Sequence, residues 1–130
     1  MTKLYAIIEG TEYEQPYTLE IVDNEEYANW FCREINKCSD NWHTYYVQDY
    51  VKPTVHKINP KAKRTLLLGF AFKLDTLEIE AAEYYEYELS AIGVDRELKL
   101  ILVNGVGGSY EECLKHALKE AIAEKSSKKP

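Results

Sequence analysis

Residues 99–123 read KLILVNGVGGSYEECLKHALKEAIA, and this stretch decides how the second half of the chain folds. Leu98–Val103 has the apolar pattern of a strand, and a glycine-rich turn follows it. Ser109 and Glu112 have the spacing of a capping box, in which each residue satisfies a free N–H group at the start of a helix. The residues that follow form one apolar stripe at helical spacing, namely Tyr110, Cys113, Leu114, Ala117, Leu118, Ala121 and Ile122. We therefore predict a strand, a turn and a helix that packs on a sheet.

The glycines of this stretch, Gly105, Gly107 and Gly108, allow two interpretations. In the first, they supply positive φ angles for a tight connection between strand and helix. In the second, the free N–H groups of the turn and the helix dipole bind a phosphate together with Ser109. The second interpretation needs a cation as well, and the candidates are Arg64, Arg96 and the lysines of residues 57–63. The carboxylates that open the helix favour the first interpretation, because they would repel an anion.

The first half of the chain predicts a hairpin, a helix and a strand. Alternating apolar residues mark strands at Leu4–Ile8 and Tyr17–Ile21, with turn chemistry between them. Asp23 with Glu26 predicts the N-terminus of a helix over residues 24–37, and His43–Val51 alternates as a third strand. Residues 52–64 carry two prolines and five cations without an acid, which is typical of an exposed basic connector.

Two segments complete the predicted sheet. Thr65–Leu74 is apolar at nearly every position and predicts a strand that is covered on both faces. Leu77–Ala91 fits a strand with the odd positions facing inward, and it also fits a broad helical face; β-branched and aromatic residues favour the strand. A bulge is expected near Ala81–Glu83, because 15 residues is long for an unbroken strand.

The predicted fold class is α+β, in the order β-β-α-β-β-β-β-α. A mostly antiparallel sheet of five to six strands would carry two packed helices. We expect a single domain over residues 1–125 and a disordered tail over residues 126–130, SSKKP.

Composition limits the classes of function. The net charge of −6 is uneven: residues 1–51 carry ten acids and three bases, and residues 65–97 carry eight acids and two bases. A chain of this kind is a poor binder of nucleic acid, which requires clustered cations, and we expect no direct contact with it. No apolar run is long enough to span a bilayer, and three cysteines indicate reduced thiols, so we expect a cytoplasmic protein without a membrane anchor.

Two sets of surface residues are candidates for binding another protein. The strand interpretation of residues 77–91 places Glu78, Glu80, Tyr84, Glu86 and Glu88 on one face, which is either a solvated surface or a contact surface for a basic partner. The chain also has eleven tyrosines, and Tyr46 and Tyr50 lie on the polar side of their strand. Exposed tyrosines suit interfaces, either with a foreign protein or with a second copy of this chain in a homo-oligomer.

Catalytic and metal sites have less support. Cys113 and His116 are close enough on one helix to act as nucleophile and base, but a buried thiol and a surface imidazole explain them better. The spacing of Cys32, Cys38 and His43 fits no compact zinc site. We therefore predict no catalytic residue, no metal and no cofactor.

One resemblance bears on function. KLYAIIEG near the N-terminus, YTLEIVDNEEYANWFCREIN and YYVQDYV resemble the short strand–strand–helix–strand proteins found in bacteriophage genomes, and GGSYEECLKHALKEAIAEK near the C-terminus is similar. Proteins of this kind often resemble inhibitors of bacterial defence systems. The resemblance implies a non-enzymatic protein in the cytoplasm of a bacterial host that blocks a host protein with a basic surface. The alternative is a sponge that holds a signalling nucleotide at residues 105–109, at an oligomer interface.

Overall fold

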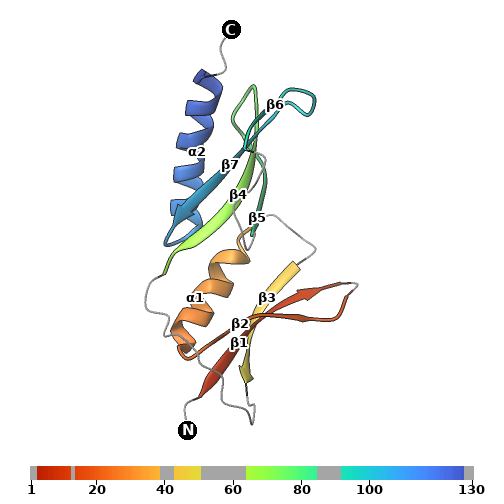
Figure 1. Cartoon of the computed structure of the whole chain (residues 1–130), viewed down its shortest axis with the longest axis vertical. Helices are drawn as coiled ribbons and strands as arrows, with labels where there is room; N and C mark the ends of the chain where they lie inside the picture. The colour runs from red at the N-terminus through yellow and green to blue at the C-terminus, as the bar shows by residue number, and fades with distance from the viewer. Residues whose placement is uncertain (1–2, 13, 39–42, 51–63, 85–91, 128–130) are drawn as a thin grey trace. The chain divides into compact units, whose positions relative to one another are not determined.

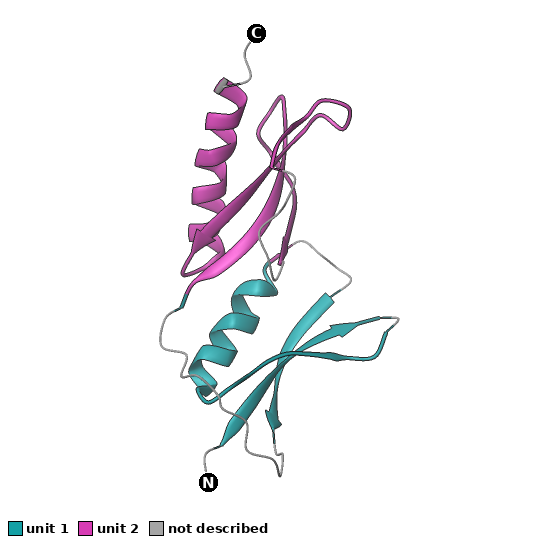
Figure 2. Cartoon of the chain, viewed as in Figure 1, with its two compact units in different colours: residues 1–37, 41–64 teal, residues 38–40, 65–130 magenta. Residues whose placement is uncertain are grey.

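The computed structural model describes residues 3–12, 14–38, 43–50, 64–84 and 92–127 (Figure 1). The chain forms two compact units, which Figure 2 shows in different colours. Unit 1 comprises residues 1–37 and 41–64, and unit 2 comprises residues 38–40 and 65–130. The expectation of one domain over residues 1–125 stays a prediction, and each unit is described by itself.

The fold is α+β, as predicted, with two helices and seven strands among the described residues. The strands form two antiparallel sheets of three and four strands, whereas one sheet was expected. The additional strand is the short β6, in a segment predicted as a turn. In chain order the elements are β1 (Leu4–Thr11), β2 (Tyr17–Val22), α1 (Glu25–Ile35), β3 (His43–Tyr50), β4 (Leu66–Lys73), β5 (Ile79–Tyr84), β6 (Gly93–Asp95), β7 (Leu100–Gly107) and α2 (Tyr110–Ser127).

Unit 1 is a sheet in the order β2-β1-β3 with helix α1 packed on it. The helix begins one residue later than predicted, because the side chain of Asn24, and not that of Asp23, accepts the Tyr27 N–H at 3.0 Å. Both residue types cap helices well, so their order in the sequence did not decide between them. Tyr27, Phe31 and other residues of the predicted stripe are buried, as expected.

The C-terminus of α1 is tied to the sheet by one side chain. The Asn36 amide donates to the Tyr45 carbonyl at 2.7 Å, and the Asn36 side-chain oxygen accepts the Tyr45 N–H at 2.9 Å. The side chain thus bonds to β3 as a neighbouring backbone amide would. These two bonds fix the position of the helix end against the strand, in addition to the burial of Ile35.

Unit 2 is a sheet in the order β5-β4-β7-β6 with helix α2 packed on one face. Directly paired residues of an antiparallel sheet share a face, and the pairs Phe70–Val103 and Phe72–Ile101 are buried beneath the helix. The stripe of α2 meets them through small side chains, since Cys113, Ala117 and Ala121 are all fully buried. The strand predicted over Thr65–Leu74 is therefore the centre of the core of this unit.

The strand interpretation of Leu77–Ala91 is confirmed over residues 79–84, and residues 85–91 lie outside the described part of the chain. The register with β4 shifts at Glu80, close to the predicted bulge. An extra residue inverts the alternation that follows it. Ala82 is consequently buried opposite Phe70, which corrects the prediction that odd positions face inward along the whole strand.

Three further predictions concern the ends and the connector. Helix α2 continues through Ser127, two residues into the predicted tail, and residues 128–130 lie outside the described part. Of the predicted basic connector, the structure describes only Arg64. Neither described helix is long and apolar enough to cross a membrane.

Candidate functional site

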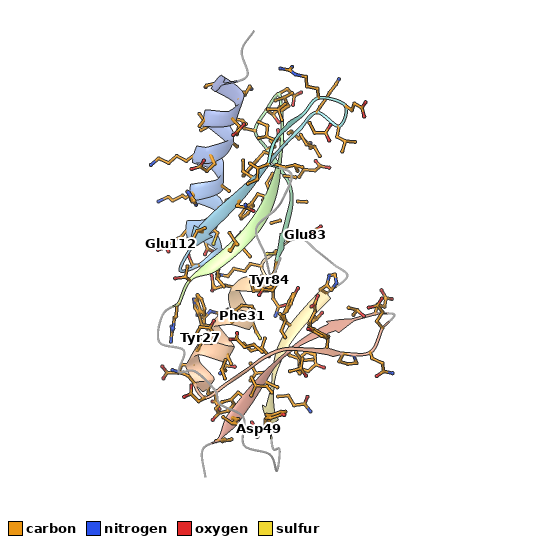
Figure 3. All side chains as sticks on the ribbon, in the orientation of Figure 1. Tyr27, Phe31, Asp49, Glu83, Tyr84 and Glu112 are labelled. Carbon is orange, nitrogen blue, oxygen red and sulfur yellow. The ribbon has the colours of Figure 1, made fainter. Side chains whose placement is uncertain are left out.

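The acidic residues predicted to bind a partner lie at the outer edge of unit 2. β5 is the first strand in the sheet order, so it has a neighbour on one side only among the described residues. Glu78 precedes the strand and Glu80 lies at the bulge, and both are exposed. Tyr84 ends the strand, is half-buried and pairs with the buried Leu68, so it lies on the face of the sheet that α2 covers. This corrects the prediction that Tyr84 shares a solvated face with the glutamates. Glu86 and Glu88 lie outside the described residues. Figure 3 labels Glu83 and Tyr84 at this end of β5.

One carboxylate at this strand has a cation nearby. Lys73 Nζ lies 3.8 Å from the carboxylate of Glu78, and both side chains are largely exposed. An exposed ion pair at this distance contributes little, on the order of 0–1 kcal/mol, and leaves the carboxylate accessible. We call Glu78, Glu80 and Glu83 the acidic β5 surface. Glu80 and Glu83 belong to β5, Glu78 lies directly before it, and Glu83 is half-buried.

Tyr46 and Tyr50 belong to a different sheet. They lie on β3 in unit 1, opposite Ile8 and Leu4 of β1. Tyr46 is 40% exposed and Tyr50 is half-buried. The single acidic and tyrosine-bearing sheet face expected from the sequence is therefore divided between two sheets. The sequence could not show this, because every strand had been assigned to one sheet.

The glycine-rich stretch is mostly strand. Gly105 and Gly107 are part of β7, and Gly108 lies between β7 and α2. None of the three has a positive φ angle, so the prediction that they supply positive φ angles for the connection is wrong. A Cβ atom at Gly105 would overlap the Cys113 carbonyl oxygen and lie 2.9 Å from Phe70 Cε2. Gly105 and Gly107 are required because α2 packs directly against the strand at both positions.

The N–H groups of this stretch are bound by side chains of α2. The Gly108 N–H donates to Glu112 Oε2 at 2.6 Å, where a phosphate oxygen would otherwise bind. The Glu112 N–H donates to Ser109 Oγ at 3.2 Å, so Ser109 caps the helix as predicted. The Val106 N–H donates to His116 Nδ1 at 2.9 Å. A carboxylate, an imidazole and a hydroxyl thus occupy three donors that an anion site would use.

Of the predicted cations, Arg64 belongs to unit 1 and Arg96 to unit 2, and the lysines of residues 57–63 lie outside the described residues. Arg64 pairs with Glu26 at 3.7 Å and lies over the Trp30 ring in unit 1. Arg96 follows β6, whose last residue Asp95 pairs with Leu100 at the start of β7. The seven residues from there to Gly107 extend about 24 Å along the strand. Within unit 2, Arg96 and the glycine-rich end of β7 are therefore at opposite ends of the sheet.

The candidate nucleophile and base do not form a pair. Cys113 is fully buried, and its Sγ lies 3.6 Å from the Leu66 carbonyl oxygen. His116 Nδ1 is bound to Val106, and its Nε2 lies 3.4 Å from Glu120. In unit 1, burial raises the pKa of the Cys32 thiol to about 11, which keeps it protonated at neutral pH. The described residues contain no group of three His, Cys, Asp or Glu side chains that could hold a metal ion.

The described residues of unit 2 also line two cavities. One of about 550 Å³ is lined by Ile92–Glu97 and Leu102, around the hairpin of β6 and β7. The other, of about 210 Å³, lies between β7 and α2 beside His116. The only signal in the sequence was the spacing of His116, Glu120 and Glu124, four residues apart on one helix.

Comparison with known proteins gives no family: no protein-family model, no curated protein and no solved structure matches this chain. The function therefore has to be inferred from the chain's own residues. Among these, the acidic β5 surface combines charge, exposure and a position on an outer strand. The glycine-rich stretch, by contrast, is occupied by contacts within unit 2.

Proposed function

We propose that the chain is a non-enzymatic binding protein that recognises a basic surface of another protein through the acidic β5 surface. The observation that carries the proposal is the outer strand β5, with the exposed Glu80 on it and the exposed Glu78 directly before it. Complementary charge speeds association and disfavours acidic competitors.

The proposal extends to the biological setting. The resemblance to small bacteriophage proteins supports a role in the cytoplasm of a bacterial host, as an inhibitor of a defence protein. An inhibitor of this kind acts by covering a surface of its target, so it needs no catalytic group and no cofactor. Tyr46 and Tyr50 of unit 1 supply a second contact surface, for the same target or for another copy of the chain.

Charge reversal tests the proposal. The double variant Glu78→Lys and Glu80→Lys is compared with the wild-type chain as bait in a bacterial lysate, and captured proteins are quantified by mass spectrometry. We expect a basic protein that is captured by the wild type and is at least tenfold depleted with the variant, because repulsion replaces attraction. Both positions are exposed, so the variant is expected to keep its fold.

The matched control is the double variant Glu12→Lys and Glu14→Lys. It makes the same change of charge at two exposed positions between β1 and β2 in unit 1. Capture by this control should equal that of the wild type. Equal capture by both double variants, or the absence of any protein enriched by the wild type, contradicts the proposal.

The nucleotide sponge has less support. Its donors are engaged within unit 2, since Glu112 accepts the Gly108 N–H and His116 accepts the Val106 N–H. A nucleotide phosphate would have to displace a carboxylate and then remain beside it. The repulsion between the two anions opposes binding at this place.

A further inference from the structure

A second candidate binding site lies in unit 2, where α2 passes beside β7. The cavity there has a volume of about 210 Å³. Ile92, Val103 and Val106 form an apolar wall, and His116, Glu120 and Glu124 of α2 form a polar one. The volume corresponds to roughly seven water molecules at about 30 Å³ each, so the cavity suits a ligand of about six non-hydrogen atoms.

The polar wall carries negative charge because of how His116 is held. Its Nδ1 accepts the Val106 N–H at 2.9 Å and so carries no proton. The remaining ring proton is then on Nε2, which lies 3.4 Å from Glu120 Oε1. A neutral imidazole leaves the two glutamates as the charged groups that line the cavity among the described residues.

We infer that this cavity binds a primary ammonium group on a short hydrocarbon chain. The apolar wall would bury the methylene groups, and the carboxylate of Glu120 would bind the ammonium. Free alkylamines and lysine side chains share this chemistry. The cavity adjoins β7 and α2 and does not include β5, so the inference does not depend on the proposed function.

The test is a titration of the full chain with n-pentylamine at pH 8, followed by backbone amide NMR. We expect saturable shifts at Val103, Val106 and His116. The neutral isostere n-pentanol should bind at least threefold more weakly. Equal binding of amine and alcohol, or no saturable shift with the amine, overturns the inference.

Two variants locate the site. Glu120→Gln should weaken amine binding roughly three- to fivefold, the range expected for one partly exposed ion pair. Glu111→Gln, an equal change on the same helix outside the cavity lining, should leave binding unchanged. Equal affinity in both variants contradicts the site.

A parallel titration with Nα-acetyl-lysine methylamide, which keeps the side-chain ammonium, distinguishes the two sources of the ligand. Binding of both probes assigns the lysine side chain of a protein, and binding of n-pentylamine alone assigns a small molecule.

Discussion

Units 1 and 2 both pack one helix on an antiparallel sheet, but they differ in the size of the side chains that the helix contributes to the contact. In unit 1 the helix presents large side chains, including Tyr27, Trp30 and Phe31, whose rings contact one another. In unit 2 the fully buried residues of the helix are Cys113 and two alanines, Tyr110 at its start contacts Phe70, and the large fully buried residues lie on the strands beneath it. The glycines of β7 allow this second, closer packing. A glycine-rich strand before a helix can therefore indicate close packing instead of a phosphate site.

The largest effect is expected from Gly105→Ala in unit 2. The added Cβ would overlap the Cys113 carbonyl oxygen and lie 2.8 Å from its carbonyl carbon, so the backbone of α2 must move. Overpacking of a core typically costs about 1–3 kcal/mol, and we expect the upper end or more because the obstacle is backbone. Urea denaturation measures the change in the free energy of unfolding.

The control for that variant is Gly10→Ala in unit 1. The nearest atom to its added Cβ would be Tyr46 Cε1 at 3.3 Å, in a half-exposed ring that can move. We expect a change below about 1 kcal/mol. Similar losses at both glycines would contradict the difference in packing between the units.

The second effect concerns the helix end in unit 1. Asn36→Ala removes both hydrogen bonds to Tyr45, at 2.7 and 2.9 Å, and leaves two partly buried backbone groups without this partner. We expect a loss of about 2 kcal/mol in the free energy of unfolding, measured by urea denaturation. A loss below about 0.5 kcal/mol would mean that these bonds do not position α1.

The third effect is the loss of stability when either of the two helix caps is removed. Asn24→Ala and Ser109→Ala each remove one side-chain acceptor, which binds the N–H of Tyr27 and of Glu112 respectively. Each change should cost about 1 kcal/mol, as measured by thermal unfolding. A negligible effect at Ser109 alone would show that the bond between Glu112 and Gly108 suffices to start α2.

The smallest effect is a loss of stability at alkaline pH that arises from Cys32 in unit 1. Burial raises the pKa of Cys32 from 9.0 to about 11, so the folded chain favours the neutral thiol. This contribution to stability is complete below pH 9 and is lost as the pH rises toward 11. The urea midpoint should fall over this range, and it should fall less in Cys32→Ala. Equal falls in both chains would exclude Cys32 as a cause.

Much of the fold followed from local patterns in the sequence. Periodicity located both helices and six of the seven strands, since an amphipathic segment must bury one face wherever it packs. The division into two sheets did not follow, because strand pairing is decided by contacts far apart in the chain. The bulge at Glu80 inverted the inward face of β5, and no local residue marks its position.

The candidate site was less predictable than the fold. Exposure of Glu78 and Glu80 followed from alternation, whereas the separation of Tyr46 and Tyr50 from them depended on sheet topology. The hydrogen bond from the Gly108 N–H to Glu112 could not be predicted, because a capping box assigns a different N–H donor to that carboxylate. The cavity beside His116 arises from packing between distant elements.

We propose that this protein acts through its surfaces, whereas its glycine-rich strand serves packing. The most direct test is the melting temperature of the full chain with a panel of nucleotides and cyclic nucleotides. A ligand at one hundred times its Kd stabilises a folded protein by about 2.7 kcal/mol, which raises the melting temperature by several degrees. We predict no shift with any nucleotide. A rise that grows with the concentration of one nucleotide would contradict the claim and favour the sponge.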